Sequence, residues 1–168
     1  TRVAMEVSSH ALALHRTDEI QFAAALFTNL TRDHLDFHGT VESYLAAKGR
    51  LFEELDEQAL AVLNRDDPAW GAMAARTSAQ VLTYAVEDAA ADVHPISISA
   101  SLFETRCRVA WPQGEFEVVS PLTGRFNLSN IMAAVAGGLA LGVDPDALYE
   151  GIAQASRVPG RFERIDEG

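Results

Sequence analysis

Residues 28–48 read TNLTRDHLDFHGTVESYLAAK, and they begin at the end of an apolar run, FAAALFTN, at residues 22–29. Apolar residues at helical spacing follow Thr40, which is a suitable N-cap, so a helix carrying Lys48 is predicted. The ionisable side chains of the stretch are Asp33, His34, Asp36, His38 and Lys48. In a parallel α/β sheet, the carboxyl ends of the strands are where chemistry is placed. The stretch therefore predicts an α/β fold with a site after a strand.

Composition and charge exclude several classes of protein. The chain has 168 residues, a formal net charge of −11 and a pI near 4.7, so its surface repels nucleic-acid phosphates. Its longest apolar stretch, residues 131–143, is too short to span a bilayer. Cys107 is the only cysteine, which rules out an internal disulfide and favours the reducing cytosol. We therefore expect a cytoplasmic protein with no nucleic-acid partner and no membrane insertion.

Hydrophobic patterning predicts a mostly parallel sheet flanked by helices, with a small antiparallel insertion. The predicted strands of the parallel sheet are residues 3–7, 22–29, 60–63 and 81–84. The third of them is closed by a turn-like NRDDP, residues 64–68. The predicted helices are residues 11–16, 40–52, 69–75, 127–141 and 144–155. Three strand-like runs between residues 92 and 119 predict the antiparallel insertion. Residues 1–157 are expected to form one partial domain, and residues 158–168 a hinge into the next.

Glu6, His34 and Lys48 are candidates for one shared site. A glutamate and a histidine are ordinary residues of metal and phosphate sites, and a strand end plus the following loop can bring them together. An ammonium is a poor metal ligand, but a lysine carbamate formed with carbon dioxide presents oxygens that Mg2+ accepts. The alternative, which spacing leaves open, is a capping glutamate, a loop histidine and a solvated helix lysine.

Five motifs of this sequence resemble the central domain of the Mur ligases. They are EVSSH at residues 6–10, TNLTRDHLD at 28–36, YLAAK at 44–48, GRFNLSN at 124–130 and PGR at 159–161. The resemblance covers nearly the whole chain and implies a P-loop NTPase-like fold. The Gly-rich phosphate loop of that fold, GxxxxGK[ST], does not occur in this sequence. We therefore expect the chain to be a fragment that lacks the phosphate-loop portion of its domain.

The resemblance implies a role for each matching residue. Glu6 and His34 match ligands of the catalytic magnesium ions. Lys48 matches the carbamylated lysine that helps to hold Mg2+ and to position the γ-phosphate of ATP. Ser8 and Arg16 match residues that contact the substrate, and a guanidinium suits that role because it grips carboxylate or phosphate with paired donors. The alternatives are a surface charge for Arg16 and a partner for backbone groups at a strand end for Ser8.

A second group of residues is expected to meet the nucleotide. Asn130 matches a residue that contacts the adenine of ATP. Arg161 matches an arginine at the hinge that also reaches the nucleotide, and a plain linker charge is its alternative. Asn127 shares a helix face with Asn130, and it is also a good N-cap for that helix. The remaining acidic and imidazole residues of the opening stretch, Asp33, Asp36 and His38, are expected to support the site.

The function implied is that of an ATP-dependent amide-bond ligase. Within the family, EVSSH resembles the UDP-N-acetylmuramoyl-tripeptide synthetases. They add the third amino acid, meso-diaminopimelate or L-lysine, to UDP-N-acetylmuramoyl-L-alanyl-D-glutamate through an acyl phosphate. ATP and Mg2+ are the implied cofactors, and the UDP-linked dipeptide and the amino acid are the implied partners. The alternatives are a ligase like folylpolyglutamate synthetase or cyanophycin synthetase, and a non-catalytic remnant that only binds.

Overall fold

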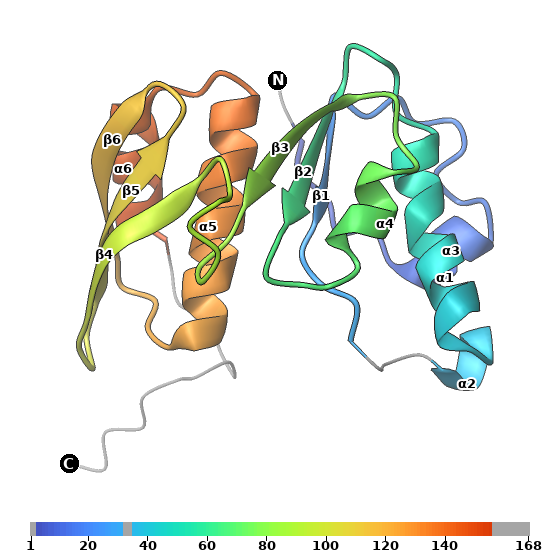
Figure 1. The fold of residues 1–168 in the computed structure, drawn as a ribbon, viewed down its shortest axis with the longest axis horizontal. Helices are drawn as coiled ribbons and strands as arrows, with labels where there is room; N and C mark the ends of the chain where they lie inside the picture. Colours follow the sequence, from blue (N-terminus) through green and yellow to red (C-terminus); the bar gives the residue numbers. More distant parts are fainter. Residues whose placement is uncertain (1–2, 32–34, 156–168) are drawn as a thin grey trace. The chain divides into compact units, whose positions relative to one another are not determined.

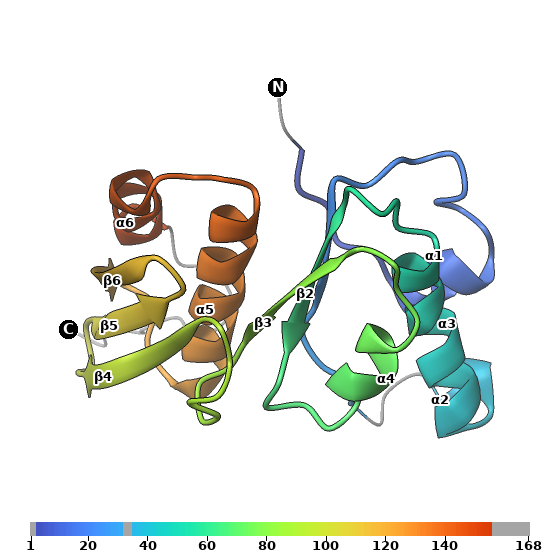
Figure 2. The ribbon, with the colours of Figure 1, turned by 45° about the horizontal axis from the view of Figure 1, so that its top comes forward.

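The computed structural model describes residues 3–31 and 35–155, which fall into two compact units. The first unit is Thr1–Thr83 and the second is Tyr84–Gly168. Figures 1 and 2 show that each unit contains a three-stranded sheet with helices beside it. The parallel α/β arrangement and the separate antiparallel sheet confirm the predicted fold class. In the described part of the chain, no helix has the length and apolar character needed to cross a membrane.

The sheet of the first unit has the order β1-β2-β3, with strands Ala24–Phe27, Leu60–Asn64 and Gln80–Tyr84. β1 and β2 run parallel, so that Phe27 lies opposite Leu63 near their carboxyl ends. Residues 61–63 of the middle strand are fully buried, as expected for an apolar run in the centre of a parallel sheet. The loops after β1 and β2 therefore leave the sheet at the same edge.

Helices cover one face of this sheet (Figure 1). Phe52 of α3 (Val41–Glu53) and Met73 of α4 (Trp70–Ala74) are buried against Phe27 and Leu63. The rings of Phe27 and Phe52 meet edge to face, with centroids 6.3 Å apart. Burying each such side chain stabilises the fold by about 1.5–3 kcal/mol. Two shorter helices, α1 (Ser9–Ala13) and α2 (Leu35–His38), pack against α3.

The start of α3 confirms the predicted N-cap. Thr40 Oγ1 accepts a hydrogen bond from the backbone N–H of Ser43 at 3.1 Å. This satisfies one of the N–H groups that the first turn leaves without a partner. Lys48 lies four residues after Tyr44 and four before Phe52, so the three side chains share one row of the helix. Both aromatic residues of that row are buried, and they direct Lys48 towards the interior side of α3.

The second unit contains the antiparallel sheet β4-β5-β6, with strands His94–Ala100, Thr105–Trp111 and Gly114–Ser120. β5 alternates between its two faces, so Cys107 and Val109 are buried while Arg106 and Arg108 are exposed. The exposed arginines form ion pairs across the strand pair, Arg106 with Glu117 at 3.1 Å and Arg108 with Glu115 at 2.9 Å. β5 and β6 pair antiparallel, from Thr105 opposite Ser120 to Trp111 opposite Gly114, and so form a hairpin.

Two helices complete the second unit, α5 (Arg125–Ala140) and α6 (Pro145–Ala153). α6 packs against both β6 and α5. Asp144 caps α6 by accepting from the backbone N–H of Asp146 at 2.9 Å, and Pro145 takes the first helical position. Gly138 of α5 lies where a side chain would collide with Leu148 of α6.

Two predicted elements differ from the structure. Residues 3–7 form no strand, and Val3 and Met5 are 85% and 52% exposed. The strand was predicted from the apolar character of this run. A strand also needs the edge of another strand, with which its backbone can form hydrogen bonds, and the apolar pattern does not show that such an edge is available. The helix predicted at residues 11–16 is α1, which begins two residues earlier. It does so because Ser8 caps it, accepting from the backbone N–H of Ala11 at 3.2 Å.

Candidate functional site

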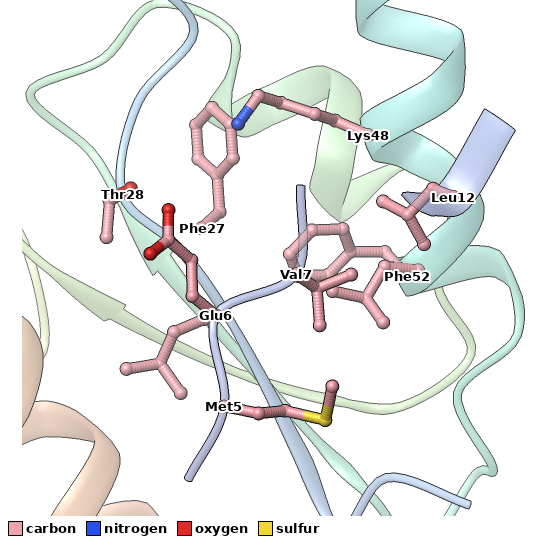
Figure 3. A pocket seen from close by; sticks show the side chains of 10 residues that line it. Met5, Glu6, Val7, Leu12, Phe27, Thr28, Lys48 and Phe52 are labelled. Carbon is pink, nitrogen blue, oxygen red and sulfur yellow. The ribbon is translucent and has the colours of Figure 1, made fainter. Parts of the chain in front are cut away.

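A pocket of about 260 Å³ lies in the first unit, at the carboxyl end of β1. It is lined by the extended segment before α1, by α1 itself, by the end of β1 and by α3 (Figure 3). The lining residues are Met5, Glu6, Val7, Leu12, Leu26, Phe27, Thr28, Lys48, Leu51 and Phe52. Seven of these residues are apolar and three, Glu6, Thr28 and Lys48, bring polar groups to the pocket, a combination that is typical of a binding site.

Glu6 and Lys48 bring opposite charges into this pocket from different segments. Figure 3 shows the Lys48 side chain reaching over from α3 and the Glu6 carboxylate pointing into the same space. Burial lowers the pKa of Lys48 from its ordinary value, while the negative charges of Asp67 and Glu6 act to raise it. Burial prevails, so the amine gives up its proton more readily than an exposed lysine does.

Asp67 also belongs to this region, although the sequence pattern indicated only a turn there. Its Oδ2 accepts from the backbone N–H of Leu30 at 2.8 Å, and its Oδ1 from that of Ala69 at 2.9 Å. Asn64 links the same two loops, because its side-chain amide donates to the carbonyl of Thr28 at 2.7 Å. The loop after β1 is thereby fastened to the turn after β2. The signal from which this role could have been inferred is the presence of polar residues directly after a central parallel strand.

The comparison with known proteins shows the family. Residues 1–138 match the model of the Mur ligase middle domain. The chain belongs to the Mur ligase family. A UDP-N-acetylmuramoyl-L-alanyl-D-glutamate–2,6-diaminopimelate ligase of Synechocystis sp. is 48% identical over 162 residues, which are 96% of this chain and 32% of the relative.

Solved structures of Mur ligases share the fold. One, of a UDP-N-acetylmuramoyl-L-alanyl-D-glutamate–2,6-diaminopimelate ligase, is 34% identical with a TM-score of 0.86, covering 96% of this chain and 34% of the other. The MurF ligase of Thermotoga maritima in complex with ADP is 26% identical with a TM-score of 0.76, covering 92% of this chain and 35% of the other. This chain thus spans about a third of the length of the relatives it matches.

Members of the Mur ligase family depend on ATP and magnesium. The oxygen donors of this pocket are of the kind that Mg2+ accepts. Mg2+ prefers hard oxygen ligands, and the pocket offers the Glu6 carboxylate and the Thr28 hydroxyl. The Lys48 ammonium repels a cation, whereas a carbamate on its nitrogen would add carboxylate-like oxygens. Within residues 3–31 and 35–155, no three His, Cys, Asp or Glu side chains gather in a metal-binding group. A carbamate on Lys48 would add to the oxygen donors that the pocket already offers to Mg2+.

Ser8 and Arg16, the predicted substrate contacts, flank α1 and do not line the pocket. Ser8 has a structural role, because it accepts a backbone hydrogen bond as the N-cap of α1. The Arg16 side chain is exposed. Arg50, two residues after Lys48, fastens the end of this segment to α3. Its Nη1 donates to the carbonyl of Leu12 at 3.0 Å. The segment that carries Ser8 and Arg16 is therefore held against the helix that carries Lys48.

The asparagines predicted to meet the nucleotide lie on α5 in the second unit. The N-cap of α5 is Gly124, so the predicted capping role of Asn127 is wrong. Gly124 has φ 94°, a left-handed conformation that favours glycine, and the helix begins directly after it. Asn127 lies in the first turn, where its amide donates to the carbonyl of Thr123 at 2.7 Å. Asn130 is exposed one turn later.

Several predicted residues fall outside the described part of the chain. They are Asp33, His34, Arg161 and the expected hinge at residues 158–168. Asp36 is exposed on α2. His38, on the same helix, lies 2.9 Å from Ser9 Oγ through its Nε2 and stacks on Tyr44. The YLAAK motif gives Tyr44 no role by itself, although the position of Tyr44 one turn before Lys48 is visible in the sequence.

Proposed function

We propose that this chain is the central part of a ligase that joins an amino acid to UDP-N-acetylmuramoyl-L-alanyl-D-glutamate. The observation that carries the proposal is the pocket shared by Glu6 and Lys48. The 48% identity to a diaminopimelate ligase favours this reaction over that of a folylpolyglutamate or cyanophycin synthetase. It also favours meso-diaminopimelate over L-lysine as the added amino acid, because a second curated relative, from Solibacter usitatus, carries the same ligase name.

The reaction proceeds through two displacements. A carboxylate oxygen of the dipeptide attacks the γ-phosphorus of ATP, the bond to the ADP oxygen breaks, and an acyl phosphate forms. The amine nitrogen of the amino acid then attacks the acyl carbon, phosphate leaves with the bonding electrons, and the nitrogen loses a proton. Both reactants of the first step are anionic, and bound magnesium lowers their repulsion and stabilises the charge of the transferring phosphoryl group.

Glu6 and Lys48 supply the anionic oxygens of this site. Lys48 becomes anionic when its neutral amine attacks carbon dioxide and loses a proton to give a carbamate. Its lowered pKa supports this step, because it increases the fraction of neutral amine at a given pH. The further proposed roles are metal binding for His34, substrate binding for Ser8 and Arg16, and nucleotide binding for Asn127, Asn130 and Arg161. We place the reaction in the cytoplasm, which the single cysteine supports.

The test is a ligase assay with the intact protein that carries this chain. ADP formation is measured with ATP, Mg2+, UDP-N-acetylmuramoyl-L-alanyl-D-glutamate and either meso-diaminopimelate or L-lysine. We expect ADP to form only when the dipeptide is present, and faster with meso-diaminopimelate. Formation of ADP with a folate and glutamate instead would support the alternative ligase, and no acceptor-dependent ADP would support the non-catalytic remnant.

Two variants and the isolated chain sharpen this test. Lys48→Ala is expected to abolish activity in the intact protein, and added bicarbonate is expected not to restore it. Arg76→Ala is the matched control. Arg76 forms an ion pair with Glu53, which lies on α3 like Lys48, but Arg76 does not line the pocket. The 168-residue chain alone is expected not to turn over, because it contains no phosphate loop.

A further inference from the structure

An aromatic cluster joins α1, α2 and α3, and the proposed reaction uses none of its rings. His10 of α1 meets Phe37 of α2, with ring centroids 4.2 Å apart. His38, the next residue of α2, stacks on Tyr44 of α3 with centroids 5.1 Å apart and ring planes at 21°. Phe37 and His38 meet edge to face at 4.8 Å. The rings therefore form a continuous contact from α1 to the helix that carries Lys48.

Tyr44 connects this cluster to the pocket. It precedes Lys48 by one helical turn, and the two side chains share one face of α3. Lys48 Nζ lies over the Tyr44 ring, 5.3 Å from its centroid, so the end of the lysine side chain is beside the ring face. Lysine has a long flexible stem, so a fixed surface beneath it restricts the directions in which its nitrogen can point. Tyr44 is such a surface, because it is 3% exposed.

His38 links the Tyr44 ring to the segment that carries Glu6. Its Nε2 lies 2.9 Å from Ser9 Oγ, across 29 residues of sequence, and Ser9 is 3% exposed. Ser9 follows Glu6 by three residues. The support beneath Lys48 and the segment that presents the pocket's carboxylate are thus joined by one ring stack and one hydrogen bond.

We propose that Tyr44 is a positioning residue whose ring face holds the Lys48 side chain in the pocket with Glu6, and that His38 holds that ring in place. The effect on turnover rests on the proposed function, whereas the contact between ring and lysine does not. The role belongs to the ring face and not to the hydroxyl. We therefore expect Tyr44→Phe to preserve the positioning of Lys48. Tyr44→Leu, which introduces an apolar side chain without a ring, is expected to lose it.

The contact can be measured directly in the intact protein that carries this chain. Lysine labelled with 13C at Cε gives one side-chain NMR signal for each lysine, and Lys48, the only lysine among these 168 residues, is identified by the signal that Lys48→Arg removes. Protons above an aromatic face are shifted upfield by the ring current. We expect the Lys48 ε-protons of the wild type and of Tyr44→Phe to resonate upfield of their position in the urea-unfolded chain. In Tyr44→Leu we expect them at the unfolded position.

Two results would overturn the inference: an unshifted wild-type signal, or an upfield shift that persists in Tyr44→Leu. His38→Asn provides a second variant that leaves residue 44 intact, and it decides the question if Tyr44→Leu does not fold. We expect it to reduce the upfield shift, and an unchanged shift would overturn the role of His38. His94→Asn is the matched control, because His94 bonds to the carbonyl of Ala91 at 2.8 Å within the second unit.

Turnover of the intact ligase provides a separate measurement. We expect Tyr44→Leu to lower kcat by roughly 10- to 100-fold, as for a misplaced catalytic group. The KM values for ATP and for the UDP-linked dipeptide are expected to stay within roughly twofold. Tyr44→Phe is expected to retain the wild-type kcat, and equal losses in both variants would contradict a role for the ring face. If the wild-type protein forms no ADP, the proposed function fails, while the NMR signal still decides where Lys48 lies.

Discussion

Asp67 accepts a hydrogen bond from the backbone N–H of Leu30 at 2.8 Å, across 37 residues of sequence. The other oxygen of the same carboxylate accepts from the backbone N–H of Ala69 at 2.9 Å. One side chain thus satisfies two backbone donors, one in the loop after β1 and one beyond the turn after β2. The loop after β1 begins with Thr28, which lines the pocket, so this link helps to set the pocket's shape.

We expect Asp67→Ala to lower the free energy of unfolding by about 1–3 kcal/mol, because it leaves partly buried donors without an acceptor. Asp67→Asn is expected to recover only part of the loss, since an amide has one accepting oxygen and its NH2 group would face a donor. Urea denaturation followed by circular dichroism measures both changes. Glu57→Ala, at an exposed side chain, is the control. Equal midpoints for Asp67→Ala and the wild type would show that water replaces the carboxylate without cost.

Lys48 makes the stability of the first unit depend on pH. Burial lowers its pKa below the value of about 10.4 for an unfolded chain. The ammonium therefore costs folding free energy at pH values below the folded-state pKa, and the cost disappears as the pH rises through about 10.4. We expect Lys48→Met to be more stable than the wild type at neutral pH, with a difference that closes towards that upper value. Urea denaturation at a series of pH values measures the difference.

The pKa of Lys48 can also be read from the NMR signal of its side chain. We expect its titration midpoint to lie below about 10.4 in the wild type. In Asp67→Asn it is expected to fall further, because the Asp67 charge acts to raise the pKa. A wild-type midpoint at the unfolded value would mean that solvent reaches the amine freely and that burial does not control it.

Features of the fold that depend only on residues adjacent in the sequence were predictable. The runs at residues 22–29, 60–63 and 81–84 overlap β1, β2 and β3, because apolar runs indicate strands that bury side chains. Thr40 and Asp144 mark the starts of α3 and α6, since an N-cap needs only the next two or three residues. The prediction that Asn127 is an N-cap was wrong. Glycine is also a suitable N-cap residue, and the conformation of the chain before the helix, which residue types alone do not show, places the cap at Gly124.

The candidate site was predictable only in part. The EVSSH and YLAAK motifs pointed to Glu6 and Lys48, and the structure places both in one pocket. The hydrogen bonds that link Asp67 to Leu30 and His38 to Ser9 span 37 and 29 residues. No local pattern contains such contacts, because they arise only when the fold brings separate segments of the chain together.

Cys107 makes the stability of the second unit depend on alkaline pH. Its side chain is 1% exposed, and burial, with a smaller contribution from the charge of Glu117, raises its pKa to about 11. An unfolded thiol ionises near pH 8.5, so the unfolded state is favoured progressively as the pH rises from about 8.5 to 11. At pH 9.5 this is expected to cost about 1.4 kcal/mol.

Urea midpoints at pH 7.5 and 9.5 test this expectation. The wild type is expected to lose more stability between the two pH values than Cys107→Ala, which has no thiol to ionise. A thiol reagent is also expected to label the folded chain slowly at pH 8 and the urea-unfolded chain rapidly. Rapid labelling without urea would contradict the burial of this side chain.

The packing of α5 on α6 predicts opposite effects for two glycine substitutions. A Cβ on Gly138 would lie 2.4 Å from Leu148 Cδ2, whereas a Cβ on Gly151 of α6 would meet no atom within 4 Å. Replacing glycine by alanine within a helix stabilises it by up to about 1 kcal/mol, but overpacking a buried contact costs about 1–3 kcal/mol. Gly138→Ala is therefore expected to lower the free energy of unfolding, and Gly151→Ala to raise it by about 0.5–1 kcal/mol.

A second background separates the collision at Gly138 from other causes. Leu148→Ala removes the atoms that the new methyl group would meet, and by itself it is expected to cost about 2–5 kcal/mol as a buried leucine truncation. In that background, Gly138→Ala is expected to become neutral or stabilising, because only the gain in helix propensity remains. The four unfolding free energies form a double-mutant cycle, and urea denaturation provides each of them. If Gly138→Ala destabilises both backgrounds equally, Leu148 is not what limits the approach of α6 to α5.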